Sequence, residues 1–126
     1  MTQDYFRELI QKLLVSPAIS SFRIIRQKVQ EDDGYIRIKC RLRKAQKLEF
    51  AEYVQVHAGK IIVITYNYHW QDAHGALVKR WDNVPHHKEV DSFPHHVHVS
   101  ETEVISSEPV TLENVLREME ERLSTP

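Results

Sequence analysis

The stretch Tyr35-Ile36-Arg37-Ile38-Lys39-Cys40-Arg41-Leu42-Arg43 alternates apolar and charged side chains along almost its whole length. Because successive side chains of a β-strand point to opposite faces of the sheet, this pattern predicts a strand with one apolar and one cationic face. The preceding segment Ile19–Gln30 is also rich in residues that favour strands, and the turn at residues 31–34 ends in an Asp-Gly step typical of hairpins. The two segments are therefore predicted to pair antiparallel.

Three further strands are predicted downstream of this hairpin. Lys47–His57 and Lys60–Gln71 flank the short connection Ala58-Gly59, and Ala76–Trp81 follows a turn at residues 72–75. Five strands joined by tight turns predict an antiparallel meander. The run Ile61–Ile64 within the fourth strand is apolar on both faces, so we expect that strand to lie centrally and to be covered by a helix on at least one side.

A helix is predicted at each end of the chain. Apolar residues recur with the spacing of one helical face over residues 3–15, just before Pro17, and again over Thr111–Leu123. The sequence thus predicts an α+β fold, a twisted antiparallel meander sheet of about five strands with an N-terminal and a C-terminal helix. A length of 126 residues is that of one domain, so residues 1–126 are expected to form a single α+β domain.

The sequence contains no signal for membrane insertion or export. Its longest apolar run is Ile61–Ile64, far short of the roughly 20 residues that cross a bilayer, and no basic region leads into an apolar one near Met1. The lone Cys40 cannot form an internal disulfide and sits on the apolar face of its strand, where an inert thiol is expected. We therefore expect a cytoplasmic protein without membrane contact.

Charge is distributed unevenly along the chain. Residues 1–68 carry 12 Lys+Arg against 7 Asp+Glu, whereas residues 99–126 carry 2 against 7. The positive side chains on one face of the predicted strand repel each other unless negative charge lies close to them. That charge could come from an RNA backbone, from an acidic protein partner, or from Glu49 or Glu52 on the next strand. The residues predicted to bind RNA through this stripe are Arg37, Lys39, Arg41 and Arg43.

Seven of the eight histidines lie within residues 69–98, together with two tryptophans. Histidine can accept and donate a proton near neutrality, so two imidazoles and a cation suffice to cleave RNA without a metal or other cofactor. In this hypothesis the histidines supply acid and base, Arg80 stabilises the transition state, Asp82 orients a histidine, and the rings of Trp70 and Trp81 stack on bases. The predicted catalytic residues are His69, Arg80, Asp82, His86 and His96.

Metal binding is the competing interpretation of the same segment. His96 and His98 project to one face of an extended segment, and His86 or His87 with Asp82 would add nitrogen and oxygen donors. The candidate metal ligands are then His86, His96 and His98. Individual imidazoles could instead anchor an irregular loop at residues 82–94 by bonding backbone carbonyls. The sequence contains no glycine-rich phosphate-binding loop, since its three glycines occur singly.

Three motifs give the chain a specific resemblance. They are Tyr68-His69-Trp70-Gln71-Asp72, Arg80-Trp81-Asp82-Asn83-Val84-Pro85-His86-His87 and Phe93-Pro94-His95-His96-Val97-His98. In these motifs, and in their order between an N-terminal helix and a short acidic C-terminal helix, the sequence resembles the TumE family of small bacterial toxins from toxin–antitoxin pairs. The resemblance implies a toxin whose partner is a small helix-turn-helix antitoxin encoded beside it, and an action on RNA.

Two functions therefore remain open from the sequence. The first is a toxin that acts as a metal-independent endoribonuclease through its His/Arg cluster, with RNA and the antitoxin as partners. The second is a non-catalytic binding module whose His/Trp-rich segment forms a protein interface or a structural metal site. A homodimer is compatible with both. The acidic helix Thr111–Leu123 must bury its apolar stripe against its own sheet, a second protomer or an antitoxin.

Overall fold

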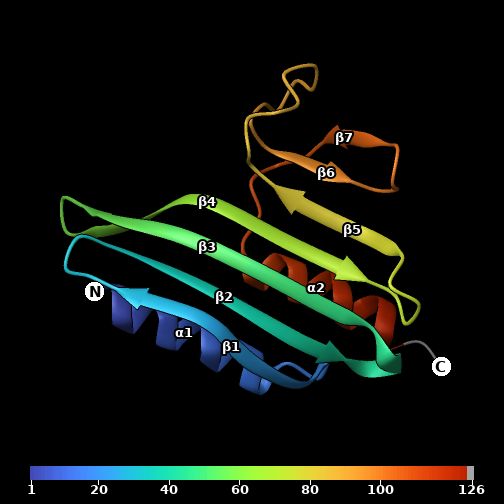
Figure 1. Cartoon of the computed structure of the whole chain (residues 1–126), viewed down its shortest axis with the longest axis horizontal. Helices are drawn as coiled ribbons and strands as arrows, with labels where there is room; N and C mark the ends of the chain where they lie inside the picture. Colours follow the sequence, from blue (N-terminus) through green and yellow to red (C-terminus); the bar gives the residue numbers. More distant parts are fainter. Residues whose placement is uncertain (125–126) are drawn as a thin grey trace.

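The computed structural model of the chain describes residues 1–124. These residues form a sheet of seven strands in sequential order, each antiparallel to the next, with one helix before and one after it (Figure 1). The elements are α1 (Thr2–Val15), β1 (Ile19–Val29), β2 (Asp33–Leu42), a 3-10 turn (Arg43–Ala45), β3 (Lys47–His57), β4 (Lys60–Gln71), β5 (Leu77–Asp82), β6 (His96–His98), β7 (Val104–Ser106) and α2 (Leu112–Leu123).

The α+β class, the meander and both helices are confirmed, and β3 and β4 have their predicted bounds. The count of about five strands is wrong, because β6 and β7 extend the sheet beyond β5 to seven strands. Each of the two has only three residues, too few for a visible alternation. Arg43 also leaves the predicted strand. It begins the 3-10 turn, in which Lys44 and Ala45 have positive φ angles of 62° and 60°.

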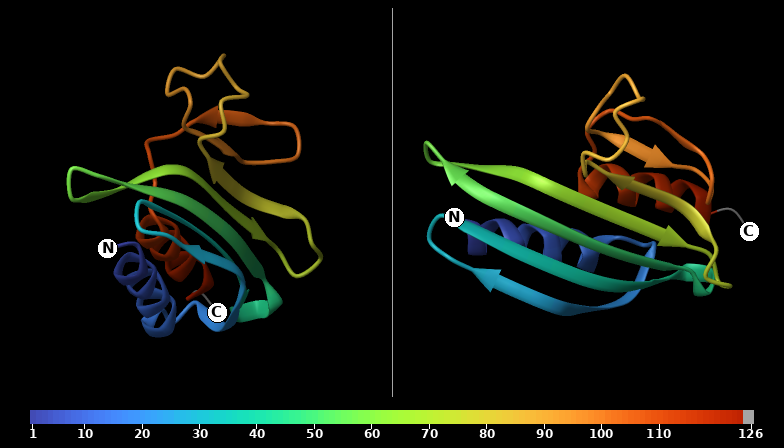
Figure 2. Two further views of the ribbon diagram at one scale, coloured as in Figure 1. Left: turned by 60° about the vertical axis from the view of Figure 1, so that its left-hand side comes forward. Right: turned by 45° about the horizontal axis from the view of Figure 1, so that its top comes forward.

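Both helices lie against the same side of the sheet, here called the helix face (Figure 2). The opposite side is the outer face. Alternation decides which side chains point to each: Ile36, Ile38, Cys40 and Leu42 of β2 are buried on the helix face, as the sequence predicts. The apolar stripe of α2 joins the same core, so the helix covers its own sheet, with Leu112, Val115, Leu116, Met119 and Leu123 buried.

Local contacts fix α2 in this position. The Thr111 side chain accepts a hydrogen bond from the Asn114 backbone N–H, and the Asn114 side chain accepts one from the Thr111 N–H, which forms a capping box. Further along the helix, Glu118 pairs with Lys79 of β5 at 2.9 Å, and Glu120 accepts a hydrogen bond from Ser16 after α1 at 2.7 Å. Polar residues of α2 thus tie it to the sheet and to the segment after α1.

The expected helix cover over Ile61–Ile64 is wrong for most of that run. Ile62, Val63 and Ile64 are 44%, 36% and 37% exposed, although β4 is the central strand of the seven. The β3–β4 hairpin extends past the ends of both helices, so its tip has no layer above it (Figure 1). Between residues 1 and 124, neither helix is long and apolar enough to cross a membrane.

Glu52 is a buried carboxyl on the helix face, only 1% exposed. The hydroxyls of Tyr5 in α1 and Tyr68 in β4 both donate to it, each at 2.5 Å. Burial raises the pKa of Glu52 above its usual value, although the two tyrosine hydrogen bonds act in the opposite direction. The expectation that Glu52 pairs with the cationic stripe is therefore wrong, because Glu52 points to the other side of the sheet.

Candidate functional site

Like charges stand directly opposite each other on the outer face of the first three strands. The β1–β2 register pairs Arg23 with Lys39, and the β2–β3 register pairs Arg41 with Lys47. Such pairs destabilise a sheet, since their side chains lie only about 4.5–5.5 Å apart at Cβ. A further like-charge pair joins Arg26 to Arg37. The cationic stripe predicted on β2 is thus part of a wider cationic surface.

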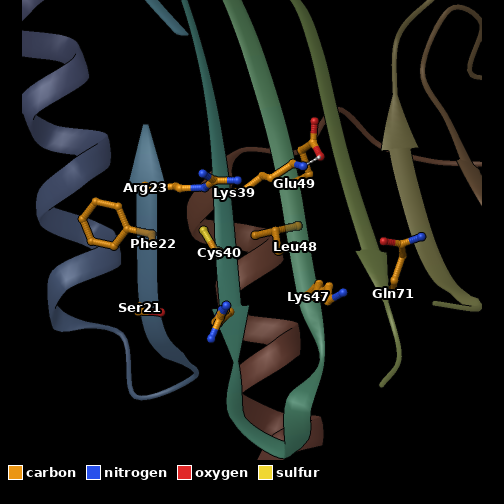
Figure 3. Close-up of a pocket in the computed structure, with 10 residues that line it drawn as sticks. Ser21, Phe22, Arg23, Lys39, Cys40, Lys47, Leu48, Glu49 and Gln71 are labelled. Carbon is orange, nitrogen blue, oxygen red and sulfur yellow. Dashed lines mark ion pairs between the residues drawn. The ribbon is translucent and has the colours of Figure 1, made fainter. Parts of the chain in front are cut away.

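This surface contains a groove of about 590 Å³ (Figure 3). Arg23, Lys39, Arg41 and Lys47 line it together with Glu49 of β3 and Gln71 of β4. The Glu49 carboxylate lies 2.5 Å from Arg37 and 3.8 Å from Lys39. The predicted pairing with Glu49 is therefore confirmed for two of the cations, while Arg41 has no acidic partner within ion-pair distance among residues 1–124.

A smaller pocket of about 190 Å³ adjoins the groove at Glu49. His69 of β4 stands opposite Glu49 on one side and opposite Arg80 of β5 on the other, and Arg37 completes the polar rim. Burial and the nearby Arg80 lower the pKa of His69, and the negative charges of Glu49 and Glu101 offset part of this shift. The pocket therefore combines a carboxylate, an imidazole and two guanidinium groups.

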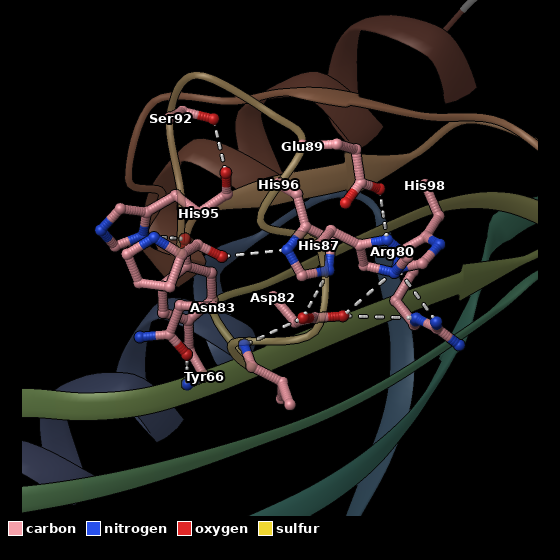
Figure 4. A network of polar contacts seen from close by, with 12 residues as sticks. Tyr66, Arg80, Asp82, Asn83, His87, Glu89, Ser92, His95, His96 and His98 are labelled. Carbon is pink, nitrogen blue, oxygen red and sulfur yellow. Dashed lines mark hydrogen bonds and ion pairs between the residues drawn. The ribbon is translucent and has the colours of Figure 1, made fainter.

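Asp82 at the end of β5 organises a second cluster beside this pocket (Figure 4). It is 3% exposed, and its Oδ1 lies 2.8 Å from His96 Nε2. Its Oδ2 lies 3.5 Å from Arg80 Nε and 3.7 Å from His98 Nε2. Arg80 Nε is in ion-pair range but is buried without a hydrogen-bond partner, and Arg80 Nη2 lies 3.1 Å from His98 Nε2. Asp82 thus holds Arg80 beside the imidazoles.

Three imidazoles meet in this cluster. The ring centroids of His87, His96 and His98 are 4.7 to 5.2 Å apart. Burial, followed by the charge of Arg80, lowers the pKa of His98 to about 4, so its ring is neutral at pH 7. His87 comes from the loop after β5, whereas the other two rings come from β6. The short strand β6 therefore brings both of its histidines to the same face as Asp82.

The loop between β5 and β6 is held by side chains that belong to the resemblance motifs. Asn83 accepts a hydrogen bond from the Tyr66 backbone N–H at 2.9 Å and donates to the Ile64 carbonyl at 3.0 Å. His95 Nδ1 lies 2.8 Å from the Tyr66 hydroxyl, and the two rings are stacked. Asn83 and His95 thus anchor the loop through contacts that the sequence did not predict. The predicted bond from an imidazole to a backbone carbonyl is made by His96, whose Nδ1 is 2.9 Å from the Pro94 carbonyl oxygen.

The comparison with known families matches residues 6–123 to the family described as Toxin TumE. The match spans nearly the whole chain, including both candidate clusters, most of α1 and all of α2. The chain belongs to the TumE toxin family. Its role as a toxin follows, and a toxin of this kind has an antitoxin partner in general. No curated protein and no solved structure matches this TumE-family chain.

Three of the residues predicted for the TumE-family site lie elsewhere. Trp70 and Trp81 are 1% and 5% exposed and point to the helix face, so their rings have no free surface for a base. Arg122 of α2 covers the Trp70 ring at 5.3 Å, and Lys79 lies 5.6 Å from the Trp81 ring centroid. His86 is exposed, and its neighbour His87 takes the expected place in the cluster.

The remaining predicted residues fall into two adjacent groups. His69 and Arg80 share the smaller pocket, while Asp82 and His96 lie in the second cluster and contact Arg80 only through the Asp82 carboxylate. Sequence reasoning missed Glu49 as a pocket residue. Its position opposite His69 depends on a β-bulge between Tyr53 and Val54 that the sequence pattern does not announce.

Proposed function

We propose that this TumE-family toxin is an endoribonuclease that cleaves RNA in the pocket between Glu49, His69 and Arg80, without a metal ion in the reaction. The observation that supports the proposal most is the register that sets His69 between Glu49 and Arg80, next to the cationic groove. The groove would hold the phosphate backbone, and the pocket would receive the scissile phosphate.

The proposed reaction is an internal transesterification. The Glu49 carboxylate accepts the proton of the ribose 2′-hydroxyl, whose oxygen attacks the adjacent phosphorus. The His69 imidazolium donates its proton to the departing 5′-oxygen, and the guanidinium groups of Arg37 and Arg80 stabilise the negative charge on the phosphoryl oxygens. The P–O5′ bond breaks as the P–O2′ bond forms, which leaves a 2′,3′-cyclic phosphate and a 5′-hydroxyl.

Other predicted catalytic residues become positioning residues in this proposal. His96 is only 1% exposed, and its hydrogen bonds run to Asp82 and to the Pro94 carbonyl. Asp82 in turn faces Arg80 Nε at 3.5 Å. These contacts would set the angle of the Arg80 side chain rather than exchange protons with the substrate.

The test is cleavage of a labelled single-stranded RNA by the purified full chain in EDTA. We expect cyclic-phosphate products, and a loss of roughly 10²–10⁴-fold in rate for His69→Ala and for Glu49→Gln. His74→Ala, in the exposed β4–β5 turn, is the matched control and should keep the full rate. Intact RNA with the unmodified chain, or full activity in His69→Ala, would refute the proposed pocket.

The dependence of the rate on pH provides a second test. As the acid, His69 must be protonated, and burial and Arg80 hold its pKa below 6.5, against the opposing charges of Glu49 and Glu101. The value of kcat/KM should therefore fall as the pH rises through this pKa, and the optimum should lie on the acidic side of neutrality. A rate that rises steadily to pH 9 contradicts His69 as the acid.

We also propose that the antitoxin is a small helix-turn-helix protein, as the TumE resemblance implies. Expression of the toxin alone should arrest bacterial growth, and co-expression of the neighbouring helix-turn-helix reading frame should relieve the arrest and yield a complex on purification. His69→Ala should abolish the arrest while the complex still forms. A neighbouring frame that neither binds nor protects would contradict this part of the proposal.

A further inference from the structure

The second cluster carries an arrangement that the proposed cleavage does not use. One nitrogen from each of His87, His96 and His98 lies within 4.8 Å of the other two. Oδ1 of Asp82, which is almost completely buried, is 2.8 Å from His96 Nε2, and its Oδ2 is 3.7 Å from His98 Nε2. Three nitrogens and a carboxylate therefore converge from the β5–β6 loop, β6 and the end of β5 (Figure 4).

In two of the three rings, those of His87 and His96, the Nδ1 nitrogen is hydrogen-bonded to a group outside the cluster. His96 Nδ1 is 2.9 Å from the Pro94 carbonyl oxygen, an acceptor, so this nitrogen carries a proton and donates. His87 Nδ1 is 2.9 Å from the Glu89 carboxylate. Histidines that bind metal ions typically donate one ring N–H to a carbonyl or carboxylate and coordinate through the other nitrogen. Both rings have the outer hydrogen bond of this pattern, and the second nitrogen of His96 faces the Asp82 carboxylate that would share the ion with it.

The charges near the cluster also suit a divalent cation. Asp82 and Glu89 supply two carboxylates, one as a ligand and one behind His87, while Arg80 is the nearby cation. Arg80 Nη2 is 3.1 Å from His98 Nε2 and would have to release that nitrogen. Its Nε can stay beside Asp82 Oδ2, at 3.5 Å, so Arg80 keeps an anionic neighbour when the ion is bound.

We propose that His87, His96, His98 and Asp82 form a site for one divalent transition-metal ion, with Zn²⁺ as the best fit to three imidazoles and a carboxylate. A tetrahedral Zn²⁺ site has bonds of about 2.0–2.1 Å and ligand atoms about 3.4 Å apart, so small rotations of the rings complete it. Four protein ligands make a closed, structural site. The ion fastens the β5–β6 loop to the sheet, and it takes no part in the cleavage at His69.

The test measures binding of Zn²⁺ to the full chain after its metal has been removed, by competition with a chromogenic chelator and by elemental analysis. We expect one Zn²⁺ per chain and a higher melting temperature when the ion is bound. Co²⁺ should bind at the same place and give the visible absorption of a tetrahedral ion.

The variants are chosen so that the fold survives. The His87 side chain is 30% exposed on the loop, so His87→Ala should still fold. The variant should bind Zn²⁺ more than about 100-fold more weakly, because the loss of a direct ligand should exceed the roughly 10–100-fold loss typical when a hydrogen-bond partner of a ligand is removed. Glu89→Gln should weaken binding by about 10-fold. His86→Ala, at the exposed neighbouring position, is the matched control and should bind normally.

Two results would overturn the site. One is less than one tightly bound Zn²⁺ per unmodified chain, and the other is an equal loss of affinity in His86→Ala and His87→Ala. Neither result depends on RNA cleavage. A chain that binds Zn²⁺ as expected but leaves RNA intact supports the metal site and refutes the ribonuclease proposal. A chain that cleaves RNA but binds no Zn²⁺ supports the ribonuclease proposal and refutes the metal site.

Discussion

Replacing two cations of the groove should strengthen the fold and weaken RNA binding at the same time. Arg23 faces Lys39 across β1 and β2, and Arg41 faces Lys47 across β2 and β3. The double variant Arg23→Glu, Arg41→Glu turns both like-charge pairs into opposite-charge pairs. All four side chains are on the outer face, so the substitutions leave the apolar core unchanged.

The size of the stability effect follows from the number of pairs that change sign. An opposite-charge cross-strand pair contributes roughly 0.2–1 kcal/mol, and a like-charge pair costs a similar amount. Each conversion is thus worth roughly 0.4–2 kcal/mol, so two converted pairs should raise the free energy of unfolding by about 0.8–4 kcal/mol. At roughly 4 °C per kcal/mol this corresponds to about 3–16 °C in melting temperature for a domain of this size. The gain should vanish in 1 M salt, where the Debye length is about 3 Å.

The effect on RNA has the opposite sign. Each phosphate of a single strand that the protein no longer neutralises should reduce the slope of log K against log salt by about 0.7, so two such phosphates should reduce it by about 1.4. Thermal melting at low and high salt and fluorescence anisotropy with a labelled RNA measure the two effects. Lys60→Glu with Lys88→Glu, two positions outside the groove, gives the same change in net charge and serves as control.

Two results would refute this reasoning. A double variant that melts below the unmodified chain at low salt would show that the like-charge pairs are not repulsive in the fold. A salt slope equal to that of the control variant would show that the groove is not the surface that contacts RNA.

Four further predictions concern the core. Glu52→Gln should raise the melting temperature at pH 7, because burial raises the pKa of Glu52 in the folded chain. A carboxyl with a raised folded pKa stabilises the fold while it is protonated, and this stabilisation is lost as the pH rises through the folded pKa. The advantage of the variant should therefore shrink toward pH 4. Met119→Ala should lower the free energy of unfolding, measured in urea, by about 2–5 kcal/mol, since the Met119 side chain of α2 is fully buried against the sheet. Truncation after Val110 removes the whole of α2 from the core and should leave a molten chain. Cys40 should resist alkylation in the native state at pH 8, because burial raises its pKa to about 12, and should react only on unfolding.

The sequence predicted the meander because its first four strands are long enough for their patterns to be unambiguous. Strand β2 alternates over its whole length, and Gly59 lies in the turn between β3 and β4. Gly34, expected in a turn, instead lies within β2 opposite Val29. The last two strands could not be predicted in this way. The segment His96–His98 has polar ends and three residues, and it pairs only because β5 supplies an edge on which it can add.

The candidate site depends on register more than on composition. Pairing counted from the Ala58-Gly59 turn would place Glu49 opposite Tyr68, but the bulge after Tyr53 shifts the register by one residue and brings His69 there instead. The same geometry explains the error at Trp70, which follows His69 and so must face the helices. Local patterns show alternation within a strand, whereas the bulge is set by packing between strands.

The two proposals share the Asp82 carboxylate, and its two oxygens explain why they are compatible. Oδ1 faces His96 and accepts a hydrogen bond from the Val84 backbone N–H at 3.1 Å, whereas Oδ2 faces Arg80. An ion bound through Oδ1 would replace the His96 contact and leave Oδ2 beside Arg80. Arg80 Nε would then keep its place beside Asp82 Oδ2 in the metal-bound and the metal-free chain, although Arg80 Nη2 would release His98 Nε2 when the ion binds. The proposed cleavage in a chelator and the proposed binding of Zn²⁺ would therefore depend on different oxygens of one buried carboxylate.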